Sequence, residues 1–250
     1  KIAAEVKGFA PGDYGIEVAE ARRMDLYSQY ALAAAHQAVA QSGLIGQVDP
    51  DRFGVNVSSG IGGIDTFLRE SEKLIARGPS RVSPLCIPML IGNMAAGNIA
   101  IRYGARGACV PVVTACATST HSVGEAFHKI RHGYLDAVIS GGSEAAVNPI
   151  AIAGFASAMA LSDANEPLAS SLPFDGRRKG FVLGEGAAVL VLENLEKAQA
   201  RGAKILGEVV GYGSTCDAFH ITAPQPQGEG AARAIRQALE EAGHKQGESL

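Results

Sequence analysis

The sequence has 250 residues, a formal net charge of −3 at pH 7 and 47% hydrophobic residues. This length allows one large domain or two small ones, and the apolar fraction is sufficient for a sizeable buried core. The slightly acidic charge argues against nucleic acid as a partner. No apolar run approaches the ~18–20 residues that a membrane span needs, which argues against a membrane protein.

Helix-like and strand-like segments alternate along the chain, which predicts an α/β layered fold. A glycine follows each helix-like segment, as in helices that end with a left-handed cap. Helices are predicted at residues 26–42, 64–77, 88–103, 116–132, 195–201 and 229–242. Strands, most of them continuous apolar runs, are predicted at residues 53–57, 109–113, 137–140, 187–192 and 205–212. Residues 161–172 are rich in turn-forming residues and are predicted to form a long loop.

The chain has four cysteines, none of them in a Cys-x-x-Cys pair: Cys86, Cys109, Cys116 and Cys216. In a chain of this length, such cysteine usage predicts reduced thiols and a cytoplasmic location. No signal-peptide pattern follows Lys1.

Cys116 lies where the apolar run 109–113 gives way to a helix-like segment. At such a junction a cysteine faces the unpaired N–H groups and the positive dipole end of the helix, which favours the nucleophilic thiolate. The same N–H groups can stabilise an oxyanion on a substrate carbonyl. The residues alone leave two interpretations open, because a cysteine in an alanine-rich turn is often only a small buried side chain.

Longer motifs resemble a known family. They are TACATSTHSVGEAF at 114–127, DAVISGGSEA at 136–145, GFASAMALS at 154–162, PFDGRRKGFVLGEGAAVLVLE at 173–193 and DAFHITAP at 217–224. In order and spacing they resemble the β-ketoacyl-acyl-carrier-protein synthases, the condensing enzymes of fatty acid synthesis. The likeness runs from about residue 22 to residue 237 and is greatest to the type II elongating synthases.

The resemblance implies an α/β thiolase-like fold, layered α/β/α/β/α, built from two similar halves. Residues 1–196 would form the N-terminal half with the nucleophile, and residues 197–250 the beginning of the C-terminal half. The family's first strand, and its later motifs with two catalytic histidines and a lysine, do not occur between Lys1 and Leu250. The sequence is therefore interpreted as an internal segment of a longer enzyme, and its activity alone is doubted.

The activity implied is that of a 3-oxoacyl-acyl-carrier-protein synthase, an acyltransferase. An acyl chain on Cys116 would condense with malonyl-acyl-carrier protein, with loss of carbon dioxide. The resemblance implies acyl carrier protein as partner, a homodimer, and neither metal nor organic cofactor.

The resemblance also assigns roles to further residues. Ile61 would close the far end of an acyl pocket, and Phe155 would line it. A basic pair, Arg22 and Arg23, would dock the acidic carrier protein. The loop with Asp217, His220 and Thr222 would form the entrance to the active site, with His220 near Cys116 but not catalytic.

Three alternatives remain open. A polyketide ketosynthase shares the cysteine motif. A non-catalytic condensing-enzyme-like subunit is disfavoured by Cys116, which such subunits usually replace. A serine hydrolase is the third, because Gly141-Gly142-Ser143-Glu144-Ala145 nearly matches the GxSxG nucleophile elbow. Ser143 would then act with Asp163 or Asp175 and with His220 or His244.

Overall fold

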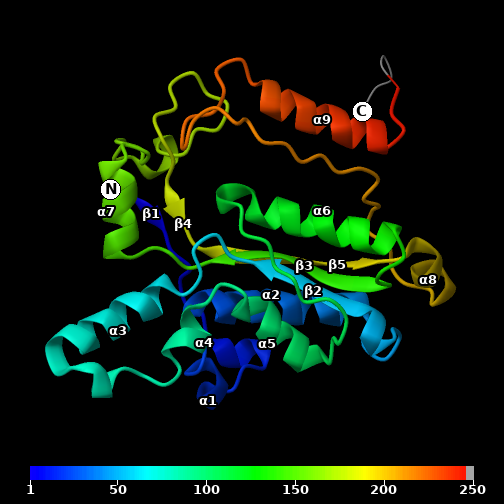
Figure 1. The fold of residues 1–250 in the computed structure, drawn as a ribbon, viewed down its shortest axis with the longest axis horizontal. Coiled ribbons are helices and arrows are strands. Elements are labelled where there is room, and N and C mark those ends of the chain that lie inside the picture. Colours follow the sequence, from blue (N-terminus) through cyan, green and yellow to red (C-terminus); the bar gives the residue numbers. More distant parts are fainter. Residues whose placement is uncertain (246–250) are drawn as a thin grey trace.

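The computed structural model describes residues 1–245 of the chain. At its centre is a three-stranded sheet of order β2–β3–β5, with helices on both faces (Figure 1). A second, two-stranded sheet pairs β1 with β4. No helix within residues 1–245 is long and apolar enough to cross a bilayer. The layers of helices and sheet confirm the predicted α/β class.

The register of the central sheet places the carboxyl ends of two strands, β2 and β3, side by side. β2 (Phe53–Ser58) runs parallel to β3 (Ala137–Glu144), and β5 (Gly186–Glu193) runs antiparallel to β3. These three predicted strands are confirmed: β2 and β5 are one or two residues longer than expected, and β3 continues for four residues beyond the predicted end. Because β2 and β3 are parallel, their carboxyl ends lie at the same edge of the sheet, the usual position of ligand sites in such sheets.

Helices cover both faces of this sheet. α2 (Leu26–Ser42) packs on β5 and β3, α5 (Met94–Tyr103) packs on β2, and α6 (Thr118–Arg131) packs on the opposite face (Figure 1). The main core lies between the sheet and the α2–α5 layer. Its largest fully buried side chains include Tyr27, Leu32, Phe53, Val55, Val57, Ile99 and Ile139.

Local signals set the ends of α2, which begins and ends where predicted. The Asp25 side chain accepts a hydrogen bond from the Tyr27 N–H at 3.4 Å and caps the helix. It also accepts bonds from the Thr66 N–H at 2.9 Å and the Thr66 hydroxyl at 2.6 Å. Gly43 ends the helix at φ 60°. Asp25 thereby ties α2 to the start of α3 (Ile64–Arg77), whose predicted bounds are also confirmed.

The single helix predicted over residues 88–103 is wrong. The chain forms α4 (Cys86–Leu90) and then α5, separated by three residues. Ile91 is extended, at φ −67° and ψ 130°, and Gly92 follows it. The Ile91 carbonyl accepts a hydrogen bond from the Tyr27 hydroxyl at 2.6 Å, so the break is stabilised by α2.

The strand predicted over residues 109–113 is also wrong. The segment pairs with β2 through a single isolated parallel bridge, Val55 to Cys109, and forms no ladder within the described chain. Pro111 has no N–H to donate to a ladder. The Val112 N–H donates instead to the Ser58 hydroxyl oxygen at 3.1 Å.

Residues 205–212 form no strand, because no strand of the described chain lies beside them to complete a ladder. They run from α8 (Leu195–Ala200) toward α9 (Glu229–Glu241), which lies beyond α6 from the sheet (Figure 1). Both helices match their predictions to within one residue. The Tyr212 N–H donates to Glu241 Oε2 at 2.8 Å, and His128 of α6 lies 3.0 Å from Glu241 Oε1. These contacts attach α9 to α6.

Two α-helices of the described chain, the short α1 (Val18–Ala21) and α7 (Pro149–Ser157), are not among the predicted ones. α7 is capped by Asn148, whose side chain accepts from the Ala151 N–H at 3.0 Å. The predicted long loop, residues 161–172, lies within the mostly irregular stretch between α7 and β4. The remaining elements are β1 (Ala3–Ala4), α1 (Val18–Ala21), β4 (Leu183–Gly184) and 3-10 turns at Pro11–Tyr14, Pro50–Arg52, Pro79–Arg81, Ala115–Ala117 and Pro167–Ala169.

Candidate active site

Three segments meet at the carboxyl edge of the parallel strands. They are residues 59–61 after β2, the turn 114–117 before α6, and Glu144 at the end of β3. The Gly60 N–H donates to Glu144 Oε2 at 3.0 Å. A Cβ added to Gly60 would lie 2.9 Å from Glu144 Oε2 and 3.4 Å from the Ala115 carbonyl oxygen. The fold thus assembles a site from segments far apart in the sequence.

Cys116 occupies the middle of the 3-10 turn Ala115–Ala117, directly before α6, and its side chain is exposed. The Ala117 N–H closes the turn on the Thr114 carbonyl at 3.1 Å. Ala115 has φ 50°, a left-handed conformation that costs roughly 1–2 kcal/mol for an L-residue. Such strain is often found at functional sites. The helix predicted to begin at residue 116 begins instead at Thr118, so Cys116 lies just outside it.

Side chains from the first turns of α6 hold this turn in place. Thr118 Oγ1 accepts from the Thr114 N–H at 2.8 Å. His121 Nδ1 lies 2.6 Å from Thr114 Oγ1, and its Nε2 lies 3.3 Å from Ser214 Oγ. His121 therefore joins the turn to the segment that precedes α9.

A buried polar cluster attaches α6 to strand β2 of the central sheet. The Ser122 hydroxyl lies 2.8 Å from Ser58 Oγ and 3.0 Å from the Thr118 carbonyl oxygen. Asn56 of β2 donates to the Ser122 carbonyl at 2.9 Å. Because these groups are buried, their mutual hydrogen bonds are costly to lose, and they fix the helix on the sheet. Sequence reasoning did not find this cluster.

Glu144 is a second group that sequence reasoning missed. Burial raises the pKa of its carboxyl above the ordinary value, although hydrogen bonds from Ser59 and from backbone N–H groups of Gly60, Ile61 and Ala145 oppose the shift. The available signal was an acidic residue in the short Gly-Gly-Ser-Glu sequence that follows the predicted strand 137–140.

The two predicted acyl-pocket residues lie on neighbouring elements. Ile61 follows β2 and is 42% exposed. Phe155 of α7 packs edge-to-face on Phe181, with ring centroids 5.2 Å apart. Phe155 also belongs to an apolar cluster that includes Ile64, three residues after Ile61. The structure therefore brings α7 to the start of α3.

The predicted entrance loop is exposed and held by its own hydrogen bonds. Asp217 Oδ2 accepts from the Gln225 N–H at 2.8 Å. His220 Nδ1 accepts from the N–H groups of Thr222 at 3.1 Å and Ala223 at 3.0 Å. The link from this region to the Cys116 turn that the structure shows runs through Ser214 and His121.

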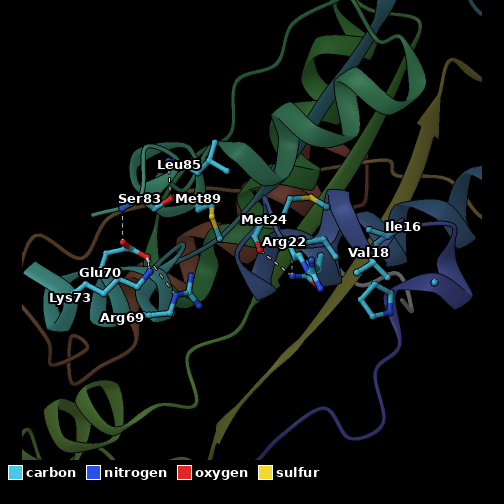
Figure 2. Close-up of a pocket in the computed structure, with 14 residues that line it drawn as sticks. Ile16, Val18, Arg22, Met24, Arg69, Glu70, Lys73, Ser83, Leu85 and Met89 are labelled. Carbon is cyan, nitrogen blue, oxygen red and sulfur yellow. Dashed lines mark hydrogen bonds and ion pairs between the residues drawn. The ribbon is translucent and has the colours of Figure 1, made fainter. Parts of the chain in front are cut away.

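Arg22 lies at a pocket of about 580 Å³ between α1, α3 and α4 (Figure 2). Arg23, the next residue in the chain, is exposed. Glu70 is buried in the pocket wall and accepts from Lys73 Nζ at 2.6 Å and from the Ser83 N–H at 2.8 Å. These donors, Lys73 first, lower the pKa of Glu70. The rest of the lining includes Ile16, Val18, Met24, Arg69, Leu85 and Met89.

The geometry around Ser143 does not fit a serine hydrolase. Ser143 is 6% exposed, and it lies within β3 opposite Ala187 rather than on a sharp turn. Its hydroxyl has no hydrogen-bond partner within the described residues. The suggested acids are engaged elsewhere, Asp175 with Arg177 at 2.7 Å and Asp163 with Lys179 at 4.0 Å.

Residues 1–198 match the family described as "Beta-ketoacyl synthase, N-terminal domain". The chain belongs to the β-ketoacyl synthase family. Residues 206–248 match "Beta-ketoacyl synthase, C-terminal domain". The family predicted from the sequence motifs is therefore confirmed.

Similar proteins and solved structures agree with this family assignment. "3-oxoacyl-[acyl-carrier-protein] synthase 2" of Staphylococcus aureus is 50% identical over 243 residues, which are 97% of this chain and 60% of the relative's length. A β-ketoacyl synthase from Burkholderia phymatum has a TM-score of 0.85 at 34% identity, over 97% of this chain and 59% of that one. A third match, with a TM-score of 0.81 at 33% identity, is a chain from the solved complex of a type II polyketide acyl-carrier protein with its ketosynthase bound to a hexaketide. The match covers 88% of this chain and 56% of that one. The chain has the α/β thiolase-like fold.

Proposed function

We propose that the protein is a 3-oxoacyl-acyl-carrier-protein synthase that elongates acyl chains, with Cys116 as nucleophile. The observation that carries this proposal is the exposed Cys116 thiol on a strained turn at the N-terminal end of α6. The relative from S. aureus, named for this activity, supports it.

The reaction has two steps. The Cys116 thiolate attacks the thioester carbonyl of an acyl-carrier protein, and the carrier thiol leaves. The Cys116 N–H and the α6 dipole stabilise the oxyanion formed on the way. Malonyl-carrier protein then loses carbon dioxide, and the resulting carbanion attacks the Cys116 thioester. A carbon–carbon bond forms, the carbon–sulfur bond breaks, and a β-ketoacyl-carrier protein two carbons longer is released. Both substrates are thioesters, so the proposal includes no metal or organic cofactor.

The acyl chain would lie between α7 and the start of α3. Phe155 and the apolar cluster around it supply its wall, and Ile61 limits its length. Ile61 fits this role because its side chain is partly exposed at the edge of the sheet that also carries Cys116.

Acyl carrier protein is the proposed partner, as in the solved polyketide complex. Arg22 and Arg23 are exposed cations that suit an acidic carrier, and Arg69 and Lys73 stand at the same pocket as Arg22 (Figure 2). The loop with Asp217, His220 and Thr222 would form the entrance for the carrier's thioester arm.

A homodimer is supported by the outer edge of the central sheet. Beyond β2, the segment 109–113 exposes Val110 to 56% and Val113 to 63%. An exposed apolar sheet edge is a template for pairing with another chain. Val110→Lys should therefore convert the dimer to monomer in sedimentation velocity. The four free cysteines support a cytoplasmic location.

A polyketide ketosynthase is the second candidate, favoured by the 33% identical ketosynthase of the hexaketide complex. The two functions differ in product. A polyketide ketosynthase repeats the condensation without reduction of the keto group and makes a poly-β-ketone. A condensing enzyme of fatty acid synthesis releases the β-ketoacyl-carrier protein after one condensation.

The deciding experiment uses the full-length protein with acyl-carrier protein and radiolabelled malonyl-carrier protein. We expect one β-ketoacyl product, two carbons longer, and its loss in Cys116→Ala. Cys216→Ala, another exposed thiol, is the matched control and should retain the activity. Condensation that persists in Cys116→Ala contradicts the proposal.

A further inference from the structure

Glu144 lies at the junction of the three segments that build the site, yet the reaction does not use it. Ser59 Oγ donates to its Oε1 at 3.0 Å, and the Gly60 N–H donates to its Oε2 at 3.0 Å. The backbone N–H groups of Ile61 and Ala145 also favour the ionised form of this carboxyl, whose pKa they lower. One carboxylate thus binds the Ser59 side chain and the Gly60 backbone.

Each carboxylate oxygen of Glu144 faces a donor, Oε1 the Ser59 hydroxyl and Oε2 the Gly60 N–H. A carboxylate is an acceptor at both oxygens. A glutamine in the same place has one acceptor oxygen and presents an NH₂ group on the other side. Glu144→Gln therefore puts a donor where either Ser59 or Gly60 now meets an acceptor.

Glu144 and the nucleophile turn both face Gly60. A Cβ added to Gly60 would lie 2.9 Å from Glu144 Oε2 and 3.4 Å from the Ala115 carbonyl oxygen. Ala115 is the residue with φ 50° that precedes Cys116. The absence of a side chain at Gly60 therefore lets the Glu144 carboxyl and the Cys116 turn approach the same point of the backbone.

We propose that Glu144 is a positioning residue that fixes Ile61 and the Cys116 turn together, so that acyl-chain selection and nucleophile placement depend on one carboxylate. The role in chain selection rests on the proposed function; the role in placement does not. Ser59 is its partner in this role, because its hydroxyl donates to Glu144 and also accepts from the Gly62 N–H at 2.9 Å.

The test compares Glu144→Gln with Glu196→Gln, an exposed residue of α8, in the full-length protein. Three quantities are measured: amide hydrogen exchange of residues 59–62, the rate of Cys116 alkylation by iodoacetamide, and kcat and KM for carriers with short and long acyl chains. Loss of a partly buried, charge-assisted hydrogen bond should accelerate exchange at 59–62 by about tenfold. Cys116 alkylation should change several-fold, and KM should rise for long chains more than for short ones.

Each outcome is decisive. Faster exchange together with altered Cys116 alkylation, absent in Glu196→Gln, supports the positioning role. Unchanged exchange and alkylation in a folded Glu144→Gln protein overturn it. If Glu144→Gln does not fold by circular dichroism, Ser59→Ala is judged by the same two criteria. A wild-type protein that does not condense overturns the proposed function, and exchange and alkylation still decide the placement role.

Discussion

His121 Nδ1 lies 2.6 Å from Thr114 Oγ1, so a side chain of α6 reaches back across the turn that presents Cys116. Five residues along a helix put His121 and Cys116 on different faces. Residues 115–117 form a 3-10 turn before the helix, with Ala115 at φ 50°. This turn places Thr114, rather than Cys116, next to His121. His121 therefore connects the nucleophile turn, through Thr114, to Ser214 in the segment that precedes α9.

The first prediction concerns cysteine reactivity. Iodoacetamide at neutral pH should label Cys116 at least about tenfold faster than Cys216, which is also exposed but lies on no helix N-terminus. Cys109 is also exposed, but partial desolvation raises the pKa of its thiol, so it should react more slowly than Cys116. Peptide mapping after timed quenching measures all the rates. Equal labelling of Cys116 and Cys216 contradicts the assignment, and labelling of Ser143 by a fluorophosphonate would favour a hydrolase.

The second prediction concerns chain length. Ile61→Phe should spare short acyl chains and exclude the last methylenes of long ones. Each buried methylene is worth about 0.8 kcal/mol, so two excluded methylenes lower kcat/KM for the long substrate about fifteenfold. Ile75→Phe, at an 86% exposed position of α3, is the matched control. An unchanged chain-length profile in Ile61→Phe would place the end of the pocket elsewhere.

The elements predicted best are those with local signals. α2 has an aspartate cap and a terminal glycine, and the structure uses both. The chain also carried the signals of α7, an asparagine cap followed by Pro149, but they were not recognised. Segment 109–113 looked like a strand by its apolar residues, and Pro111 was the local sign against a ladder.

The remaining differences arise from tertiary contacts that no sequence window contains. Residues 205–212 have the apolar pattern of a strand, but a strand requires a neighbouring strand. Within the described chain residues 205–210 are exposed, and only Gly211 and Tyr212, at the end of the segment, contact α6 and α9. The Cys116 motif was recognisable from the sequence. The contacts around it lie far apart in the sequence: Glu144 binds the Gly60 N–H across 84 residues, and His121 contacts Ser214 across 93 residues.

The third prediction tests how that segment packs. A Cβ on Gly124 of α6 would lie within 2.2–2.4 Å of atoms of the Tyr212 ring. Gly124→Ala should therefore destabilise the protein by about 1–3 kcal/mol, as overpacking does. Gly154→Ala in α7 meets open space and should stabilise by about 0.5–1 kcal/mol through helix propensity. Urea unfolding measures both, and a stabilising Gly124→Ala would mean that Tyr212 lies elsewhere.

The fourth prediction concerns acid stability and starts from Asp136, at the foot of β3. Its carboxylate is 6% exposed and binds Arg52 at 2.8 Å and Lys197 of α8. These hydrogen bonds, that of Arg52 first, lower the pKa of Asp136 below its ordinary value. The carboxylate therefore joins the start of β2 to α8, in its ionised form.

A carboxyl whose pKa is lower in the folded than in the unfolded protein binds its proton more readily after unfolding. Its stabilising effect is complete above the unfolded-state pKa of about 3.9 and is lost as the pH falls through the folded value. Asp136→Asn should therefore cost about 1–3 kcal/mol at pH 7 and less below pH 4, so its acid unfolding curve should be flatter than that of the wild type. Asp13→Asn, at an exposed position, should leave the curve unchanged. Guanidinium unfolding at a series of pH values measures the slopes, and equal slopes for wild type and Asp136→Asn would show that this ion pair does not contribute to acid sensitivity.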